Sequence, residues 1–412
     1  MKKTIRSLVT ITVLLGTLSA WAQRPNAAMQ QAKIDIVYLA SDYLEGRETG
    51  KPGEQLAAEY IAYRFAEIGL EPKGDYGDWY QPFDFEYRAH PHAASGEART
   101  GKNVMAFLDN GAAHTIIIGA HYDHLGHGIS GSLHAGEPAI HNGADDNASG
   151  IAALLRLAAE LKGGKAKGNN YLFIGFSGEE LGLYGSKYFV NHPTINLGTV
   201  NYMINMDMVG RLKEEKVLAV YGVGTSPAFL PVLEKIQIAG IKITTSESGV
   251  GPSDHTSFYL KDLPVLHFFT GQHRQYHKPA DDAEMINYTG LLEVSDYILA
   301  LLEQLDDQPK LAFTSTKDES GDDKKVSRFK VTLGVMPDYV HSGTGMRIDA
   351  VLDGKAAANA GIKDGDIVIQ MGDLEVKDIY SYMEGLGNYE VGDKTNVKVK
   401  RGEEELEFEV EF

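Results

Sequence analysis

Four short apolar runs, each followed by a group of polar residues, constrain the fold of this chain most strongly. The runs occupy residues 115–120, 171–176, 200–204 and 264–269. Apolar runs of this length are typical of strands that are buried on both faces of a parallel sheet. Residues 149–162, between the first two runs, carry apolar residues at helical spacing. This alternation predicts an α/β fold with a mainly parallel, mixed sheet sandwiched by helices.

The polar groups that follow the runs are rich in histidine and carboxylate residues. Because functional sites in open α/β sheets gather at the carboxyl ends of the strands, we expect these groups to converge on one edge of the sheet. Histidine nitrogen and carboxylate oxygen are the donors that zinc accepts where sulfur is unavailable. In chain order, the groups are His121-Tyr122-Asp123-His124, the turn at 143–150, Glu179-Glu180, Asp207, and Tyr276-His277.

The negative charges in these groups favour a metal site over a set of ordinary turns. Asp145 and Asp146 lie in a glycine-rich turn directly before a helix that we expect to begin at Ser149. Clustered carboxylates are costly unless a cation offsets their charge. Single acidic pairs are usually part of turns, so the prediction depends on the ordered set of groups. Asp123, two residues after His121, faces the same side of an extended segment and could accept a hydrogen bond from a ligand histidine.

Residues 1–22 have the pattern of a secretory signal peptide, with Gln23 as the new N-terminus. Basic residues precede an apolar core from Leu8 to Leu18, and Ala20-Trp21-Ala22 matches a cleavage site. The alternative is a retained signal anchor, for which the apolar core is short. We therefore expect export to the periplasm or the medium, and no membrane-spanning segment in the mature chain.

Composition narrows the classes of function further. The formal net charge of −18 argues against nucleic-acid binding, because phosphate groups attract basic proteins. The chain has no cysteine, so disulfides are absent despite the predicted export, and any metal must be held by nitrogen and oxygen.

The chain is predicted to contain two folded domains. Residues 23–306 carry the βα alternation and form the catalytic domain. Residues 307–327 are polar, charged and poor in apolar anchors, which is typical of a linker. Residues 328–412 contain short strands and a helix at 356–360, and they are numerous enough for a small β-rich domain.

The ordered motifs of the first domain resemble those of the secreted co-catalytic di-zinc aminopeptidases. That family also has glutamate carboxypeptidase-like and glutaminyl cyclase-like branches. The resemblance covers residues 28–305, and it implies the zinc exopeptidase fold with two zinc ions per chain. Its markers are His-x-Asp, Asp-x-x-Ser-Gly, Gly-Glu-Glu, an aspartate after an apolar strand, Ser-Asp-His and Tyr-His-x-Pro-x-Asp.

The resemblance implies a role for each motif residue. His121 and Asp207 are expected to bind one zinc ion, Glu180 and His277 the other, and Asp146 is expected to bridge them.

Beyond the metal ligands, Glu179 resembles the general base, and Tyr276 resembles a phenol that stabilises the oxyanion. Asp254 and His255, of the Ser-Asp-His motif, are expected near the substrate pocket. The family's Arg-Glu-x-Gly turn is matched at 47–50. These roles imply hydrolysis by metal-activated water, with Glu179 accepting and returning a proton.

The second domain resembles a PDZ domain. Residues 356–368 match that family's small–x–x–Ala-Gly-Ile–x–x–Gly-Asp pattern. Leu333, Gly334, Val335 and Met336 resemble the loop that binds the C-terminal carboxylate of a peptide. The alternative is a domain that only stabilises or covers the enzyme.

The sequence therefore predicts an exported zinc aminopeptidase that acts on the N-termini of peptides or proteins. The alternatives within the fold are a glutaminyl cyclase or a carboxypeptidase. The sequence shows no obvious basic clamp for a substrate α-carboxylate, which favours the aminopeptidase. A non-catalytic peptide-binding protein is the alternative of another class, and the complete set of expected ligands argues against it.

Overall fold

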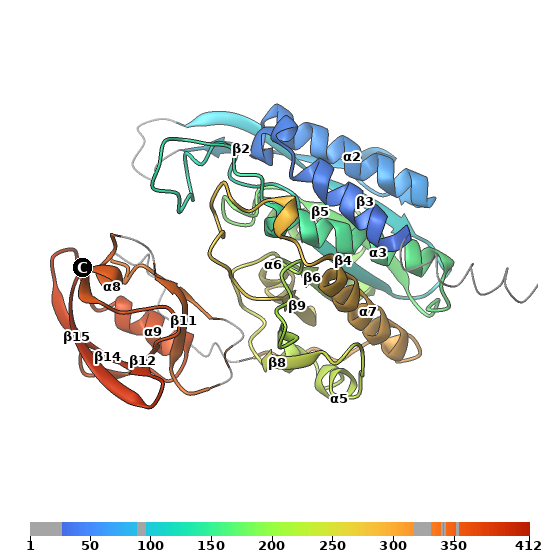
Figure 1. Ribbon diagram of the computed structural model, residues 1–412. Helices are drawn as coiled ribbons and strands as arrows, with labels where there is room; N and C mark the ends of the chain where they lie inside the picture. Colours follow the sequence, from blue (N-terminus) through green and yellow to red (C-terminus); the bar gives the residue numbers. More distant parts are fainter. Residues whose placement is uncertain (1–26, 89–95, 317–330, 339–340, 342, 352–353) are drawn as a thin grey trace, which may run out of the picture.

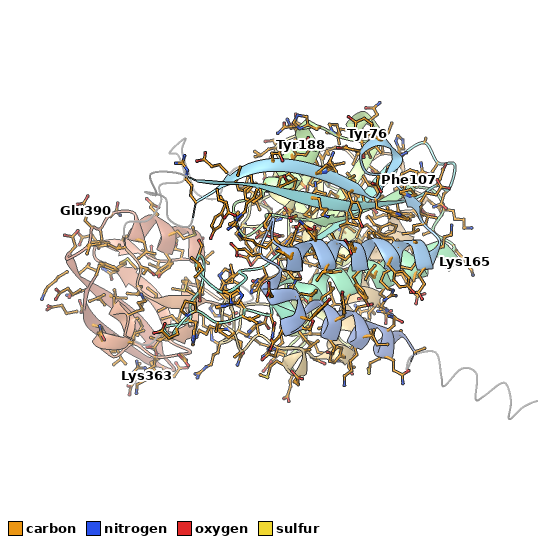
Figure 2. The ribbon with its side chains drawn as sticks, turned by 90° about the horizontal axis from the view of Figure 1, so that it is seen from above. Tyr76, Phe107, Lys165, Tyr188, Lys363 and Glu390 are labelled. Atoms are coloured by element: carbon orange, nitrogen blue, oxygen red, sulfur yellow. The ribbon has the colours of Figure 1, made fainter. Side chains whose placement is uncertain are left out.

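The computed structural model describes residues 27–88, 96–316, 331–338, 341, 343–351 and 354–412. Figure 1 shows a large domain with a central sheet and, beside it, a small C-terminal domain. Figure 2 shows the same arrangement from above, with Lys363 and Glu390 on the small domain and Tyr76 and Phe107 on the large one. The predicted signal peptide and most of the predicted linker lie outside the described residues.

A nine-stranded mixed sheet forms the centre of the large domain. Its strands are β1 (Glu71–Pro72), β2 (Tyr80–Tyr87), β3 (Glu97–Leu108), β4 (Thr115–His121), β5 (Asn170–Phe176), β6 (Val200–Met206), β7 (Val217–Tyr221), β8 (Lys242–Ser246) and β9 (Val265–Phe269). β5, β4, β6 and β9 lie side by side in that order and run parallel. β3 joins β5, and β7 joins β9, in antiparallel pairs. The four predicted parallel strands are therefore confirmed as the middle of a mixed sheet.

Helices cover both faces of this sheet (Figure 1). Residues 27–39, α2, α3, α5 and α7 pack on one face, and α4 and α6 pack on the other. The helices are α2 (Pro52–Ile68), α3 (Gly150–Gly163), α4 (Tyr184–Asn191), α5 (Phe229–Leu233), α6 (His255–Tyr259) and α7 (Tyr288–Leu305).

The two apolar layers explain why the central strands have predominantly apolar sequences. Along β4, Ile116 and Ile118 pack into the layer under α2, α3 and α7, whereas Ile117 packs under α4 and α6. Successive side chains of a strand point to opposite faces, so a strand covered on both faces needs apolar residues at every position. Most polar residues of these strands consequently lie at or near the strand ends, although His267 lies in the middle of β9.

The predicted linker begins with residues that pack on the large domain. The backbone N–H of Leu311 donates to Oδ1 of Asn201 (2.8 Å), and that of Thr314 donates to the carbonyl of Thr225 (2.8 Å). Leu311 is buried in the core. Phe313 packs on the other apolar layer, with its ring centroid 5.7 Å from that of Tyr259. The packed part of the chain therefore extends beyond the predicted boundary at residue 307, because two apolar side chains and several backbone hydrogen bonds attach a mainly polar segment.

The small domain has a six-stranded sheet and a core of its own. Its strands are β10 (Val335–Pro337), β11 (Met346–Val351), β12 (Ile367–Met371), β13 (Leu374–Glu375), β14 (Lys394–Arg401) and β15 (Glu404–Glu411), and its helices are α8 (Ala356–Ala360) and α9 (Ile379–Leu386). Gly361 ends α8 in the left-handed conformation (φ 92°), as the motif predicted. An ion pair between Arg274 of the large domain and Asp364 connects the two domains.

The loop that resembles a carboxylate-binding loop is only partly suited to that role. Gly334 has φ 75°, which favours glycine, and Val335 begins β10, the strand at one edge of the sheet. Leu333 is fully buried in the core of the small domain, and its carbonyl accepts a hydrogen bond from Ala357 (2.8 Å). The expectation that Leu333 contacts a bound peptide is therefore wrong for its side chain. The side chain of Met336 lies outside the described part.

Within the described part of the chain, no helix is long and apolar enough to cross a membrane.

Glu54 is a buried carboxyl group that connects α2 to the ends of β4 and β5. Its Oε1 accepts hydrogen bonds from the hydroxyl groups of Tyr122 (2.6 Å) and Ser177 (2.9 Å). Its Oε2 is buried and has no hydrogen-bond partner among the described residues. Burial disfavours the ionised form and raises the pKa of Glu54 to about 7.

We predict that Glu54→Gln is more stable than the wild type at pH 8, by a margin that becomes small near pH 5. The folded-state pKa of about 7 lies above the ordinary value of 4.5, so the free energy of unfolding falls as the pH rises between these values. The full cost, on the order of 3 kcal/mol, applies above about pH 7, and glutamine does not ionise. Urea unfolding of both chains at pH 5 to 8, with a chelator present, measures the difference. A difference that is independent of pH would contradict the raised pKa.

Candidate metal centre

The predicted ligands meet at the carboxyl ends of the central strands. His121 is the last residue of β4 and pairs with Phe176, the last residue of β5. Glu180 follows β5, and Asp207 follows β6 directly. His277 lies in the segment between β9 and α7. The edge-of-sheet arrangement expected from the sequence is therefore present.

His121, Asp146 and Asp207 form the first group of metal donors. Nε2 of His121 lies 3.3 Å from Oδ1 of Asp146 and 3.3 Å from Oδ1 of Asp207. The three donor atoms lie within 4.8 Å of one another.

Asp146, Glu180 and His277 form the second group. Nε2 of His277 lies 3.2 Å from Oδ2 of Asp146 and 3.3 Å from Oε2 of Glu180. Asp146 therefore offers one carboxylate oxygen to each group.

The spacing of these donors fits zinc. Two donors that are each about 2.0–2.1 Å from a tetrahedral zinc ion lie about 3.3 Å apart. The four separations from the histidine nitrogens to the carboxylate oxygens are 3.2–3.3 Å. The set of nitrogen and oxygen donors, without sulfur, is also one that zinc accepts.

The titration behaviour of the centre shows an excess of buried negative charge. Burial raises the pKa of Glu179 well above its usual value. Burial alone would lower the pKa of His121, but the carboxylates of Asp207 and Glu179 outweigh it and raise this pKa well above the usual value. Burial also acts to raise the pKa of Glu180, yet the neighbouring His277 lowers it to about 2. A divalent cation would offset this charge directly.

Asp123 contacts two residues of the centre, His121 and Glu179. Its Oδ2 accepts a hydrogen bond from the hydroxyl of Thr49 (2.9 Å), and its Oδ1 accepts one from the backbone N–H of Glu179 (3.2 Å). Nδ1 of His121 lies 3.2 Å from the carbonyl oxygen of Asp123 but 3.7 Å from its carboxylate. The carbonyl, rather than the expected carboxylate, is thus placed to fix the ring of His121.

Arg47 supports the centre in a way that the sequence did not indicate. Its side chain is 1% exposed. Its guanidinium donates to the carbonyl oxygens of Leu39, Tyr122, Asn142 and Gly143 at 2.5–2.9 Å. The match to an Arg-Glu-x-Gly turn pointed to this residue without giving its contacts.

Asp281 is a second supporting residue that the sequence did not assign. Its Oδ2 accepts hydrogen bonds from the backbone N–H groups of Asp145 (3.0 Å) and Asp146 (3.1 Å). His273 lies 3.2 Å from the carboxylate of Asp145. The last position of the Tyr-His-x-Pro-x-Asp motif therefore holds the backbone of the shared ligand.

Asp254 and His255 do not line an open pocket. Both side chains are fully buried, and His255 stacks on His267 with ring centroids 4.4 Å apart. Their expected contact with substrate is therefore not available in this conformation. Ser253 of the same motif instead donates to Oδ2 of Asp207 (2.9 Å), so this motif supports a metal ligand.

Tyr276 lies beside the second group of donors. Its ring stacks on that of His277, with centroids 3.9 Å apart. This places the residue close to the centre, as its expected role requires.

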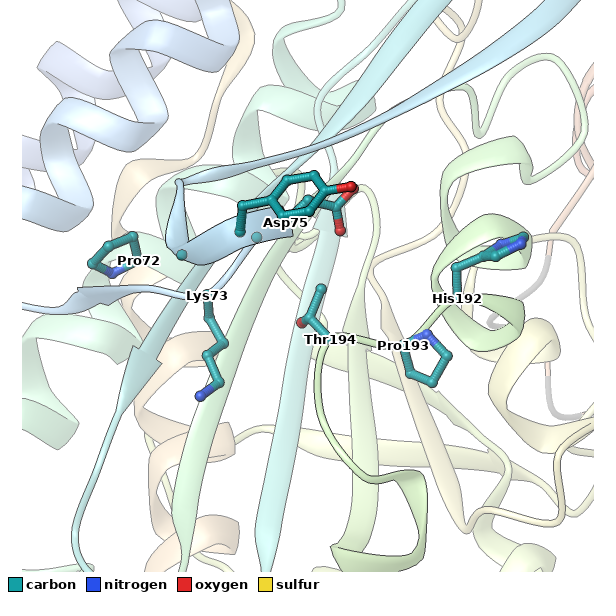
Figure 3. Close-up of a pocket in the computed structure, with 9 residues that line it drawn as sticks. Pro72, Lys73, Asp75, His192, Pro193 and Thr194 are labelled. Carbon is teal, nitrogen blue, oxygen red and sulfur yellow. The ribbon is translucent and has the colours of Figure 1, made fainter.

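A cavity of about 400 Å³ lies away from the metal centre. Figure 3 shows Pro72, Lys73 and Asp75 on one side of it, and His192, Pro193 and Thr194 on the other. The lining residues follow the start of β1 and the end of α4, and none of the predicted metal donors lines the cavity.

Two family models match the chain. Residues 103–302 match peptidase family M28, and residues 317–412 match a PDZ domain. The large domain is therefore of the peptidase family M28 type, and the small domain is a PDZ domain. The first of these matches includes the five predicted metal ligands and Glu179.

Solved structures of a zinc aminopeptidase and of a glutaminyl cyclase share the fold of the large domain. The zinc aminopeptidase BSAP from Bacillus subtilis has a TM-score of 0.55 and 18% identity, over 69% of this chain and 95% of that chain. Porphyromonas gingivalis glutaminyl cyclase has a TM-score of 0.53 and 16% identity, over 67% of this chain and 98% of that chain.

Curated relatives show higher identity over shorter stretches. Aminopeptidase YwaD of Bacillus subtilis is 32% identical over 170 residues, which are 38% of this chain and 36% of the relative. Leupeptin-inactivating enzyme 1 of Streptomyces exfoliatus is 28% identical over 224 residues, which are 48% of this chain and 47% of the relative. The chain thus spans about half or less of the length of these two relatives.

Proposed function

We propose that this chain is an exported zinc-dependent aminopeptidase that removes N-terminal residues from peptides and binds two zinc ions. The observation that carries the proposal is the shared ligand Asp146, whose two oxygens lie 3.3 Å from His121 and 3.2 Å from His277. The match to peptidase family M28 and the similarity to aminopeptidase YwaD support it. Export is proposed from the pattern of residues 1–22.

The residues around the centre suit hydrolysis of a peptide bond. When bound, zinc supplies Lewis acidity that polarises a carbonyl group and lowers the pKa of water. In this proposal the carboxylate of Glu179 accepts a proton from the attacking water and donates it to the leaving amine. The hydrogen bond from its backbone to Asp123 holds Glu179 at the end of β5. Tyr276 donates a hydrogen bond to the developing oxyanion.

The charge of the centre favours a substrate with a free α-amino group. Glu179, Glu180 and Asp207 surround the shared aspartate, and a protonated amine is attracted to such a group of carboxylates. The second candidate is a glutaminyl cyclase, because the peptidase domain also shares its fold with Porphyromonas gingivalis glutaminyl cyclase.

We predict that the purified chain releases amino acids from free-amine peptides and leaves N-acetylated versions intact. We expect Glu179→Gln to lower kcat by at least ~10²-fold with its zinc content retained, because glutamine cannot accept the proton. The exposed Glu160 on α3 provides the matched control, and Glu160→Gln should retain wild-type kcat. The assay measures amino-acid release with and without a chelator, and includes a peptide with N-terminal glutamine.

Three results would contradict this assignment. Equal hydrolysis of blocked and free peptides would exclude an aminopeptidase, and cyclisation of the glutamine peptide without hydrolysis would favour the cyclase. Zinc loss in Glu179→Gln would identify Glu179 as a ligand.

We predict that zinc-saturated wild type holds two zinc ions per chain and that Asp146→Ala holds at most one. Both donor groups lose an oxygen in this variant. Asp109→Ala, at an exposed position after β3, should match the wild type. Elemental analysis after removal of free zinc measures the stoichiometry. One zinc ion per saturated wild-type chain would contradict the shared-ligand arrangement and would favour the cyclase.

We also propose that the PDZ domain binds the C-terminal ends of peptides. PDZ domains add a peptide as an extra strand at a sheet edge and bind its carboxylate through backbone N–H groups. Here β10 lies at an edge of the sheet, directly after Gly334. Val335 is half-buried, so its side chain remains partly accessible.

We predict that the PDZ domain binds peptides with a free C-terminal carboxylate, and binds the C-terminally amidated versions at least ~10-fold more weakly. The variant Glu179→Gln is used for this test because it should not hydrolyse the peptides. A lost charge-assisted hydrogen bond contributes about 1.5–3 kcal/mol, which corresponds to such a factor. Isothermal titration with paired peptides of one sequence measures both affinities. If amidation leaves the affinity unchanged, or neither peptide binds at millimolar concentration, the domain has a structural role.

A further inference from the structure

His124 is a buried histidine beside the metal centre that has no role in the mechanism above. It lies three residues after His121, and its side chain is 2% exposed. Its Nδ1 lies 2.8 Å from Oε1 of Glu180 and 3.8 Å from Oδ2 of Asp146. Its ring meets that of His277 edge-on, with centroids 5.8 Å apart.

The distance from His124 to Glu180 differs from the distances between the expected ligands. The four histidine–carboxylate separations between expected ligands are 3.2–3.3 Å, which is the spacing of two donors around one zinc ion. The distance of 2.8 Å from Nδ1 of His124 is that of a direct N–H···O⁻ hydrogen bond. A carboxylate oxygen can only accept a hydrogen bond, and it would repel an unprotonated ring nitrogen at this distance. We therefore place the proton of His124 on Nδ1.

The two carboxylate oxygens of Glu180 have different partners. Oε1 accepts from His124, while Oε2 lies 3.3 Å from Nε2 of His277 and faces the second group of donors. Glu180 follows the end of β5 and belongs to no helix or strand, so its backbone alone does not define which way its carboxylate turns.

We propose that His124 is a positioning residue for the second metal: it holds Glu180 through Oε1, so that Oε2 completes the donor set with Asp146 and His277. The proposal rests on the metal centre of the proposed function, but not on the aminopeptidase activity. It predicts an asymmetric effect, because the first donor group, His121, Asp146 and Asp207, does not contain Glu180.

The structure also defines the competing role. His124, Asp146 and Glu180 each offer a donor atom within 4.8 Å of the others, so His124 could itself be a ligand. Asparagine distinguishes the two roles, because its side-chain NH₂ can take the place of the Nδ1–H donor but does not replace imidazole as a zinc ligand.

The test compares zinc binding by His124→Leu and His124→Asn in the full-length mature chain without substrate. Chelator competition resolves the two affinities. We expect His124→Leu to bind the first zinc as tightly as the wild type and the second ~10–100-fold more weakly, which is the usual effect of losing a partner that orients a ligand. We expect His124→Asn to bind the second zinc within ~10-fold of the wild type.

Two further variants assign the effect. His121→Ala impairs the first donor group, so in this background the substitution His124→Leu should weaken the remaining site. His192, exposed at the end of α4, is the matched control, and His192→Asn should bind both ions as the wild type does. Circular dichroism of the metal-free chains verifies folding.

Unchanged affinity for the second zinc in His124→Leu would overturn the proposal. If His124→Leu does not fold, His124→Asn provides the test. His124 would be a ligand instead if this variant binds the second zinc more than ~100-fold more weakly and its cobalt-loaded form has a changed absorption spectrum. Because every measurement is of metal binding, an inactive wild-type chain would refute the aminopeptidase and leave this result intact.

Discussion

The buried guanidinium of Arg47 is the interaction on which the arrangement of the metal centre depends. It connects the carbonyl groups of Leu39, Tyr122, Asn142 and Gly143, which come from three separate parts of the chain. Burial lowers the pKa of Arg47 to about 10, although the carboxylates of the centre favour its charged form. The planar arrangement of five N–H donors allows one side chain to bind four carbonyls, and lysine, with three donors on a flexible stem, does not match it.

The metal centre consists of ligand side chains and of supporting residues that hydrogen-bond to those ligands. Ligand side chains follow the central strands, whose ends the sheet brings to one edge. The contacts behind them fix each ligand: Ser253 holds Asp207, His124 holds Glu180, and Asp281 holds the backbone of Asp146. Most of these supporting groups are hydrogen-bonded to a single ligand, so loss of one should affect one part of the centre more than the rest.

The sequence predicted the elements whose signal is local. The apolar runs identified β4, β5, β6 and β9, since a strand buried on both faces needs apolar residues throughout. Motif spacing identified the residues that meet at the centre. The sequence did not reveal contacts between distant polar groups, such as Asp281 with Asp145, because no periodicity records them. It also did not reveal that the side chains of Asp254 and Leu333 are buried, since a motif does not say whether a side chain points into the core.

The contact between Asp281 and the turn at Asp145 has a consequence for how the protein acquires its metal. The turn at Asp145 lies before β5 in the sequence, whereas His277 and Asp281 lie after β9 and are synthesised later. A long-range contact of this kind forms late in folding, because the loop between its ends must be closed first. Under the proposed function, zinc would therefore bind a nearly complete domain, and its binding energy would add to the stability of the native state. A chain without zinc would lack one of the contacts that hold the segment after β9, and this segment would open to proteolysis more readily than in the metal-bound protein.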